Sequence, residues 1–308
     1  MGTPEFAAII LCDLLKASHQ IISIYTQKDK KVGRQQKIEK SAVKKIAEEN
    51  NLKIFQPEKF DAEVISEIKE QNPDIIIVAA YGKILPKDLL VIPKFGVINT
   101  HPSLLPKYRG ASPIQNALLN GEKETAATIM LMEEKVDAGK ILSQKKVEIK
   151  NNETYLELSK KLAKISAELL SDTLFLWIAG KIKPIQQDDK LATFCQLIRK
   201  EDGKIDWSDE AQSIYNHYRA FVVWPGIFTH WEKENKKFRL KLNKISLDCN
   251  ESQKNLQNGE VFSENDQIKI KTGKGAIVLE EIQIEGKNKT STNDFIRGYP
   301  NFIGSVLK

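Results

Sequence analysis

The residues whose types could do chemistry gather in the segment 99–115, which reads NTHPSLLPKYRGASPIQ. Asn99 and His101 are two positions apart, so in an extended chain their side chains point to the same side. An amide donor beside an imidazole can hold a carbonyl oxygen while that oxygen becomes negative, and the imidazole can also move a proton. The pair therefore predicts a site that stabilises an oxyanion.

A third candidate, Asp137, precedes Ala-Gly in a predicted turn between two strands. A carboxylate that reached His101 would favour the imidazolium and fix the orientation of the ring. Each of these residues also has an ordinary explanation. Asn at a strand end and Asp before Ala-Gly are common turn residues, and a lone His is often structural.

Other chemistries are less well supported by the sequence. Ser103 lies near His101 but has no GxSxG around it, which disfavours a hydrolase triad. The GTPEFA segment (2–7) lacks GxGxxG and GxxxxGK[ST], so neither a dinucleotide nor a nucleoside triphosphate is indicated. We expect it to start a helix, with Thr3 as its cap and Pro4 at the first helical position.

The compartment follows from cysteine usage and hydropathy. Three widely spaced Cys and four scattered His predict a reduced cytosol and no protein-bound metal. No apolar run has the length needed to cross a bilayer. We therefore expect a soluble, cytoplasmic protein.

The elements that must position the site alternate between strands and helices over the first 180 residues, which predicts an α/β domain with a mainly parallel sheet. The apolar runs 75–80 and 96–99 are typical of strands buried on both faces. Helices are predicted at 7–17, 62–71 and 152–179. Ligands of such sheets bind beyond the carboxyl ends of the strands, where residues 99–101 lie.

The pattern changes after residue 205. Short β runs separated by polar turns favour a small barrel, with the oligonucleotide-binding fold as one candidate, at 226–231, 238–247, 259–262, 267–271 and 276–284. Residues 181–204 are polar and lack periodicity. We therefore predict a catalytic domain at 1–184, a linker at 185–204 and a barrel domain at 205–308.

The charge of the chain is concentrated in one window. The 308 residues carry a net charge of +6, and residues 26–45 alone hold eight basic and two acidic side chains, a net of +6. The rest of the chain is therefore balanced. A basic window can contact the phosphates of a nucleic acid, although charge alone favours a solvated lysine-rich face.

Taken together, these pieces resemble the 10-formyltetrahydrofolate-dependent formyltransferase family, and within it the branch that acts on methionyl-tRNA. The resemblance covers nearly the whole chain. It rests on GTPEFA (2–7), TQ (26–27) with the basic window, AYGKILP (80–86), residues 99–115, TIM (128–130), VDAG (136–139), IDW (205–207), RAF (219–221) and WPG (224–226).

The resemblance implies a Rossmann-like domain followed by an oligonucleotide-binding-like barrel. It implies transfer of the formyl group of 10-formyltetrahydrofolate to the α-amine of methionine on initiator tRNA, for translation initiation. Asn99, His101 and Asp137 would be catalytic. The folate site would include Ser103, Leu104, Leu105, Pro106, Tyr81, Gly82, Ile84 and Leu85, and tRNA would bind Lys30, Lys31, Arg34 and Lys37. The enzyme would be a monomer without a metal.

Two other functions remain open. A formyltransferase acting on a UDP-amino sugar would share the catalytic trio but would not need the basic window. A non-catalytic RNA-binding protein would need the basic window but not the trio.

The resemblance also implies a short apolar strand directly before Gly2, where only Met1 stands. A strand of roughly five residues would then be missing from the middle of the sheet. We expect unpaired backbone and exposed apolar surface there, and reduced stability.

Overall fold

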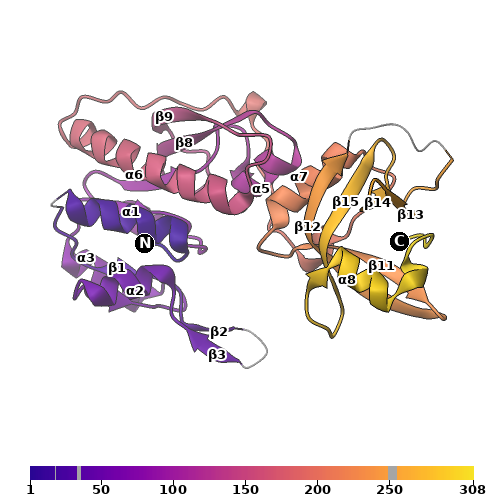
Figure 1. The fold of residues 1–308 in the computed structure, drawn as a ribbon. Helices are drawn as coiled ribbons and strands as arrows, with labels where there is room; N and C mark the ends of the chain where they lie inside the picture. The colour runs from indigo at the N-terminus through magenta and orange to yellow at the C-terminus, as the bar shows by residue number, and fades with distance from the viewer. Residues whose placement is uncertain (18, 33–35, 249–254) are drawn as a thin grey trace. The chain divides into compact units, whose positions relative to one another are not determined.

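The computed structural model describes residues 1–17, 19–32, 36–248 and 255–308. The chain divides into two compact units, each built from separate stretches of sequence. The first comprises Met1–Pro113, Lys123–Ile149 and Glu157–Gln196, and the second comprises Ile114–Glu122, Lys150–Leu156 and Leu197–Lys308. Figure 1 gives the elements of each unit.

The first unit consists of strands flanked by helices. Its helices are α1 (Glu5–Lys16), α2 (Ala42–Glu49), α3 (Ala62–Gln71), α4 (Lys87–Leu90) and most of α6 (Tyr155–Ile178), with the 3-10 turn η1 (Asp189–Leu191). Its strands are β1 (Ile24–Tyr25), β2 (Lys30–Val32), β3 (Lys37–Glu39), β4 (Ile54–Phe55), β5 (Ile76–Val78), β6 (Val97–His101), β7 (Arg109–Gly110), β8 (Glu124–Leu131), β9 (Ile141–Glu148) and β10 (Phe194–Cys195).

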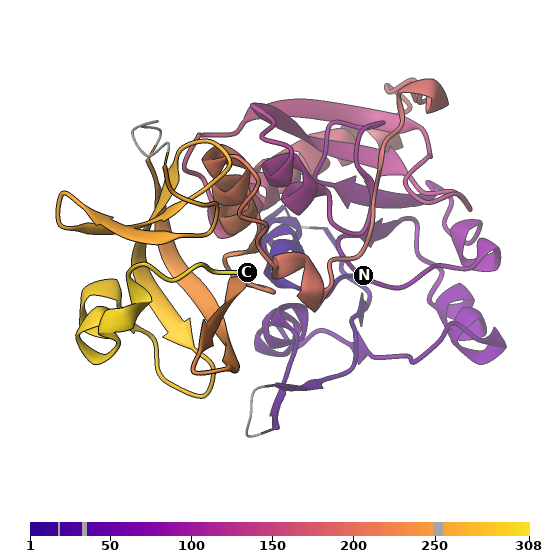
Figure 2. The ribbon, with the colours of Figure 1, turned by 90° about the vertical axis from the view of Figure 1, so that its right-hand side faces the viewer.

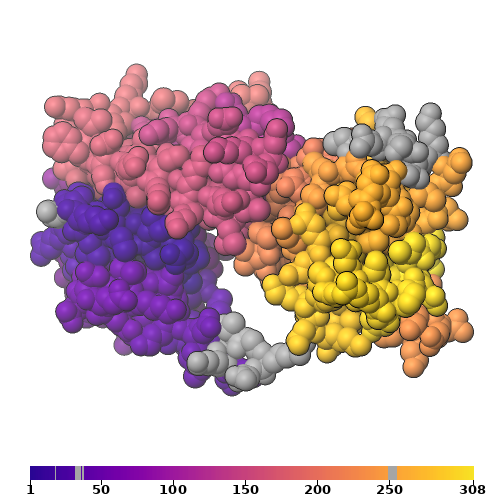
Figure 3. All heavy atoms as spheres, viewed as in Figure 1, coloured from indigo at the N-terminus to yellow at the C-terminus, as the bar shows by residue number. Residues whose placement is uncertain are grey.

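The strand pairings confirm an α/β unit with a mainly parallel sheet. Strand β1 pairs with β4, and β5 pairs with β6, both in parallel. Strands β8 and β9 continue the sheet beyond β6 in antiparallel fashion. On the face seen in Figure 3, α6 lies beside α1, and the Ser171 hydroxyl of α6 donates to the Asp13 carboxylate of α1 at 3.2 Å.

Met1 and Gly2 lie in the gap between strands β1 and β5. The Met1 amine donates to the Ile77 carbonyl at 2.6 Å, and the Gly2 N–H donates to the Tyr25 carbonyl at 3.0 Å. The Ala79 N–H donates to the Met1 carbonyl at 2.9 Å. These two residues therefore join the β4–β1 pair to the larger sheet as a very short parallel strand.

Beyond Met1 this gap holds a cavity of about 300 Å³. Its walls come from residues 21–25 and 75–79 on either side, and from α1 and α6, including Ile10, Leu14, Leu174 and Ile178. No hydrogen bond between described residues crosses from 21–23 to 75–77. The cavity lies where the sequence leads us to expect a missing central strand, and the described residues supply no strand longer than Met1–Gly2 there.

The prediction that Thr3 caps the first helix is wrong. Pro4, predicted as the first helical residue, stands instead at the N-cap position before Glu5, and no side chain caps the helix there. The Thr3 hydroxyl donates instead to the Tyr81 carbonyl, at 3.1 Å. The start of the chain is thereby attached to the loop that follows β5.

The basic window forms a β-hairpin that the sequence pattern did not predict. Strands β2 and β3 pair antiparallel, with Lys30 opposite Glu39 and Lys31 opposite Ile38. The hairpin projects from the rest of the first unit (Figure 1). Three-residue strands are too short for alternation to be recognised.

The second unit is a curved antiparallel sheet with helices. Its helices are α5 (Pro113–Leu119), α7 (Ala211–Phe221) and α8 (Thr292–Gly298), with 3-10 turns η2 (Lys200–Gly203) and η3 (Pro300–Phe302). Strands β11 (Ile227–Lys233), β12 (Lys236–Asp248), β15 (Ala276–Ile284), β14 (Gln267–Lys271) and β13 (Val261–Glu264) are neighbours in that order, and β16 (Thr290–Ser291) pairs with β15. Figure 2 shows the curvature.

Where the sequence predicts a small barrel, the structure has a curled, half-barrel sheet, and the last residues of the chain hydrogen-bond to both of its edge strands. On one side the Val261 N–H donates to the Ser305 carbonyl at 2.9 Å. On the other side His230 and Lys308 exchange two backbone hydrogen bonds, at 2.8 and 2.9 Å. The tail thus lies between the edge strands β13 and β11.

The buried side chain of Arg219, on α7, ties earlier sequence into the second unit. Its guanidinium donates to the carbonyls of Lys150 and Glu153, at 3.3 and 3.1 Å, and to the Asn216 side chain at 2.6 Å.

In the described part of the chain, no helix combines the length and the apolar character that crossing a bilayer requires.

Candidate active site

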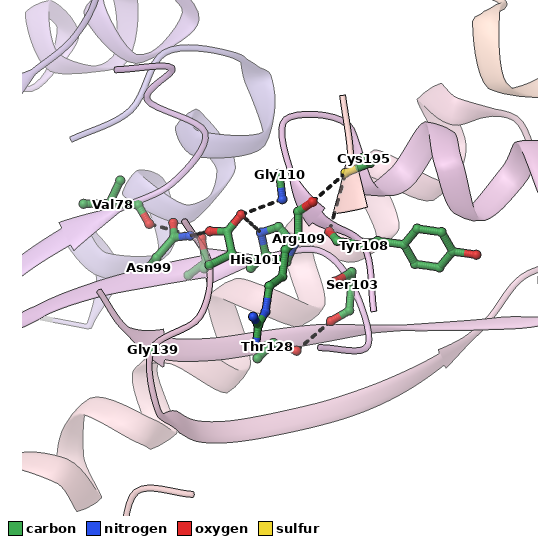
Figure 4. Close-up of polar contacts among 12 residues, drawn as sticks. Val78, Asn99, His101, Ser103, Tyr108, Arg109, Gly110, Thr128, Gly139 and Cys195 are labelled. Carbon is green, nitrogen blue, oxygen red and sulfur yellow. Dashed lines mark hydrogen bonds and ion pairs between the residues drawn. The ribbon is translucent and has the colours of Figure 1, made fainter. Parts of the chain in front are cut away.

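Strand β6 delivers Asn99 and His101 to one side of the sheet, as their spacing predicts. The strand reads VINTH and is buried at every position. The relative solvent accessibility of Asn99 is 9% and that of His101 is 4%. Figure 4 shows the two side chains side by side at the end of the strand.

The carboxylate of Asp137 joins these two side chains. Its Oδ1 accepts a hydrogen bond from Asn99 Nδ2 at 3.4 Å, and its Oδ2 lies 3.5 Å from His101 Nδ1. Oδ2 also accepts from the backbone N–H of Gly110, at 2.8 Å. One carboxylate thus contacts an amide and an imidazole from β6 and a backbone N–H from β7.

The second nitrogen of His101 is also occupied. Nε2 lies 3.0 Å from the carbonyl oxygen of Tyr108, which can only accept, so Nε2 carries a proton. Nδ1 is therefore the ring nitrogen that faces the Asp137 carboxylate. The ring of Tyr108 points away from His101 (Figure 4), so only its backbone takes part.

The hydroxyl of Ser103 is hydrogen-bonded to the backbone. Its hydroxyl donates to the Lys107 carbonyl at 2.7 Å, while its own carbonyl accepts from the Thr128 hydroxyl at 2.6 Å. The Gln144 amide donates to the Leu105 carbonyl at 3.2 Å. In the described residues the Ser103 hydroxyl makes no hydrogen bond to His101, and a serine nucleophile is not supported.

The predicted folate residues fall into two groups by burial. Tyr81 and Leu85 belong to the apolar core of the first unit, and Ser103 and Leu105 are buried in the loop after β6. Leu104 and Pro106 are half-buried, Gly82 is exposed, and Ile84 keeps 87% of its exposure. The buried members anchor the two loops, and the others are open to a ligand.

Gln27 holds the first of these loops. Its Nε2 donates to the carbonyls of Tyr81 and Gly82, at 2.9 and 3.2 Å. Gly82 has a φ of +76°, and a Cβ there would lie 2.5 Å from Gln27 Nε2. The positive φ favours glycine here, and a Cβ would displace the end of the Gln27 side chain.

The lysines of the basic window divide into paired and unpaired sets. Lys28 pairs with Glu58, Lys40 with Glu48 and Lys44 with Asp29. Lys30 and Lys31, on β2, are exposed, and neither forms an ion pair with a described residue. Lys37 lies in β3, and Arg34 is outside the described residues.

Some residues at the site carried no recognised signal in the sequence. The contact of the Gly110 N–H with Asp137 and the position of the Tyr108 carbonyl depend on a turn in which Tyr108 has a φ of +61°. Gln187, in the stretch predicted as a linker, also contacts the Asp137 turn.

Among the described residues, no three His, Cys, Asp or Glu side chains are arranged to hold a metal.

Comparison with known proteins identifies the family. The formyl transferase family matches residues 1–174, and the formyl transferase C-terminal domain matches residues 197–300. A methionyl-tRNA formyltransferase of Caldicellulosiruptor saccharolyticus is 42% identical over 100% of this chain and 98% of its own length. The chain belongs to the methionyl-tRNA formyltransferase family. A second member, from Clostridium novyi, is 39% identical over 100% of this chain and 98% of its own length.

Solved structures with the same fold include more distant formyltransferases. An N-formyltransferase of Helicobacter canadensis, in complex with folinic acid and dTDP-3-aminofucose, has a TM-score of 0.65 at 20% identity and covers 90% of this chain and 96% of its own. The sugar 3N-formyl transferase WlaRD, with dTDP and 5-N-formyl-THF, has a TM-score of 0.64 at 20% identity, covering 93% and 97%. At this identity the likeness shows only that these proteins and this chain share a fold.

Proposed function

We propose that this chain transfers the formyl group of 10-formyltetrahydrofolate to the α-amine of methionine on initiator tRNA, and that Asn99, His101 and Asp137 carry the transfer. The proposal depends above all on one observation: the Asp137 carboxylate contacts Asn99, His101 and Gly110 together. The full-length similarity to methionyl-tRNA formyltransferases supports the substrates.

The donor fits the loops that follow two neighbouring strands. Residues 81–86 follow β5, and residues 103–106 follow β6, which pairs with β5 in parallel. Ligands of open α/β sheets bind beyond such adjacent strand ends. The exposed Ile84 and the half-buried Leu104 and Pro106 offer apolar surface to a pterin-like ring.

Asn99 and His101 would act on the formyl oxygen. Asn99 Nδ2 carries two hydrogens, of which one donates to Asp137, so the other is available to the oxygen as it becomes negative. The His101 imidazolium adds positive charge at the same point. A bond forms between the methionyl nitrogen and the formyl carbon, and the bond from that carbon to N10 of the donor breaks.

Asp137 would take part in proton transfer. Its carboxylate, 3.5 Å from His101 Nδ1, would stabilise the imidazolium and would pass the proton lost by the methionyl amine, through water, to the departing N10. No covalent enzyme intermediate is needed, in agreement with the backbone engagement of Ser103.

The hairpin would bind the tRNA backbone. Lys30 and Lys31 are the exposed basic residues of β2 outside the ion pairs that hold Lys28 and Lys40. With Arg34 and Lys37 they form the segment that we assign to phosphate contacts. Such contacts release counterions and make binding dependent on salt.

A formylation assay tests the proposal. The protein is incubated with 10-formyltetrahydrofolate and either charged initiator tRNA or a UDP-amino sugar. We expect formylmethionyl-tRNA as product, its loss in His101→Ala, and its retention in the control His19→Ala, which changes an exposed histidine. Transfer to the sugar nucleotide alone, or RNA binding without any transfer, would overturn the proposal.

A further inference from the structure

A buried arginine lies directly beside the site. Arg109 retains 3% of its exposure, and its guanidinium donates twice to Gln187 Oε1, from Nε at 3.1 Å and from Nη2 at 2.9 Å. Its carboxylate contact, to Asp189 at 2.8 Å, is made with a side chain that is 64% exposed. A buried charge is costly unless hydrogen-bonded, so the orientation of Gln187 is strongly fixed by this arginine.

The other end of the Gln187 amide holds the Asp137 turn. Its Nε2 donates to the Asp137 carbonyl at 2.9 Å and to the Gly139 carbonyl at 2.7 Å. Arginine has donors only, so the amide oxygen must face Arg109 and the NH₂ group must face the turn. A cation bound to the amide oxygen also polarises the amide and strengthens its donation.

The turn needs such support. Asp137 has a φ of +51°, the left-handed region that a residue with a side chain seldom adopts. Gly139 is equally constrained, because a Cβ there would lie 1.9 Å from the Leu131 carbonyl oxygen. The position of the Asp137 carboxylate therefore depends on a strained backbone whose carbonyls are tied down by Gln187.

The segment that carries Gln187 is itself fixed against residues 109–110. Strand β10 pairs with β7 in parallel, with Phe194 opposite Arg109 and Cys195 opposite Gly110. The fit is close: a Cβ on Gly110 would lie 2.2 Å from the Cys195 carbonyl oxygen. Residues 109–110 thus reach Asp137 twice, directly through the Gly110 N–H and indirectly through Arg109 and Gln187.

We propose that Gln187 and Arg109 are positioning residues for formyl transfer, with Arg109 orienting the Gln187 amide and the amide holding the Asp137 carboxylate in place against Asn99 and His101. This rests on the proposed role of Asp137. Neither residue touches the reacting atoms.

Two substitutions of Gln187 test the relay. Gln187→Met removes every polar group of the side chain, and Gln187→Glu keeps the acceptor for Arg109 but removes both donors to the turn. We expect each to lower kcat by about ten- to a hundredfold, to leave KM for tRNA unchanged, and to shift the pH dependence of kcat. The ring ¹⁵N resonances of His101 should move as well. Arg109→Lys, which keeps the charge but cannot donate twice to one oxygen in the same geometry, should give a weaker form of the same result.

Gln71→Met is the matched control. Gln71 also uses both ends of its amide, with the Ser23 and Tyr25 hydroxyls, outside the Asp137 network. It should leave kcat, the pH profile and the His101 resonances unchanged.

The outcomes separate this inference from the function on which it rests. If Asp137→Asn is impaired while Gln187→Glu and Gln187→Met keep the wild-type kcat and pH profile, the positioning role is overturned. Lowered melting temperatures alone, with unchanged kinetics, would overturn it too. Full activity of Asp137→Asn would instead overturn the proposed role of Asp137.

Discussion

The central sheet of the first unit has two regions that contrast sharply. At the carboxyl end of β6, polar groups are densely paired: Asp137 alone contacts Asn99, His101 and Gly110. In the gap between β1 and β5, a cavity of about 300 Å³ lies behind Met1 and is lined mostly by apolar side chains. The contrast suggests a division that can be tested: the proposed chemistry uses a few satisfied polar groups, and the stability of the unit depends on how the gap between β1 and β5 is filled.

The first test breaks the polar region alone. Asp137→Asn keeps the shape of the side chain but removes its charge, and with it the support that we propose for His101. We expect formyl transfer to fall by about 10²–10³-fold with little change in melting temperature. Single-turnover kinetics with charged initiator tRNA measure the loss. A large fall in melting temperature would show that the site and the fold are not separable in this way.

The second test fills the cavity between β1 and β5. A five-residue apolar segment rich in Val and Ile, joined directly before Met1, could extend the Met1–Gly2 pairing along Ile75–Ile77 and Ser23. Filling half of the cavity would stabilise the unit by about 3–4 kcal/mol, or roughly 7–14 °C in melting temperature.

A Gly-Ser segment of the same length is the control for this extension. It should give no gain, since it brings no apolar side chain into the cavity. An equal gain from both segments would contradict packing as the cause, and a change in kcat would show that the two regions are coupled.

The third test uses the Met1 amine, whose burial lowers its pKa from 8.0 to about 5. Between these values the unfolded chain binds a proton that the folded chain does not. The free energy of unfolding therefore falls as the pH drops from 8 to 5, by about 1.4 kcal/mol per unit at most. Urea unfolding at pH 8 and pH 6 should show a difference of about 2–3 kcal/mol from this group. The extended chain, which has no buried amine, should lose that contribution, and an identical pH slope in both chains would refute the assignment.

The smallest expected effect lies outside both regions, on the hairpin. Changing Lys30, Lys31, Arg34 and Lys37 to Gln should weaken tRNA binding and reduce its salt slope by roughly 0.7–0.9 for each phosphate that the protein no longer neutralises. Binding of 10-formyltetrahydrofolate and the melting temperature should not change. Lys28→Gln with Lys40→Gln is the control, because both lysines are already paired with glutamates. An unchanged salt slope in the fourfold variant would remove the hairpin from the tRNA interface.

Where local pattern determines structure, the sequence was a reliable guide. The two-residue spacing of Asn99 and His101 correctly predicted that both face one side of a strand. Helix α3 and strands β14 and β15 have the bounds that the periodicity predicts. The antiparallel sheet of the second unit was also predicted from its short strands, although as a small barrel rather than a half-barrel.

Other features depend on contacts between distant residues and leave no local pattern. Gln187 stands in a polar, aperiodic stretch, and its function is visible only through Arg109 and the Asp137 carbonyl. Thr3 has the sequence context of a helix cap, but the Tyr81 carbonyl takes its hydroxyl. The roles of the predicted folate and tRNA residues stay predictions.

The pairing of residues 304–308 with both edges of the curled sheet has a consequence for the order of events during synthesis. The outer edges of β11 and β13 are covered only once this tail has left the ribosome, and residues 150–156 must wait for α7, whose Arg219 binds the Lys150 and Glu153 carbonyls. Chains are made from the amino end at roughly 5–20 residues per second. Segments of the second unit therefore spend several seconds on the nascent chain before their partners exist. Nascent-chain proteolysis should find them susceptible until the last residues of the tail emerge.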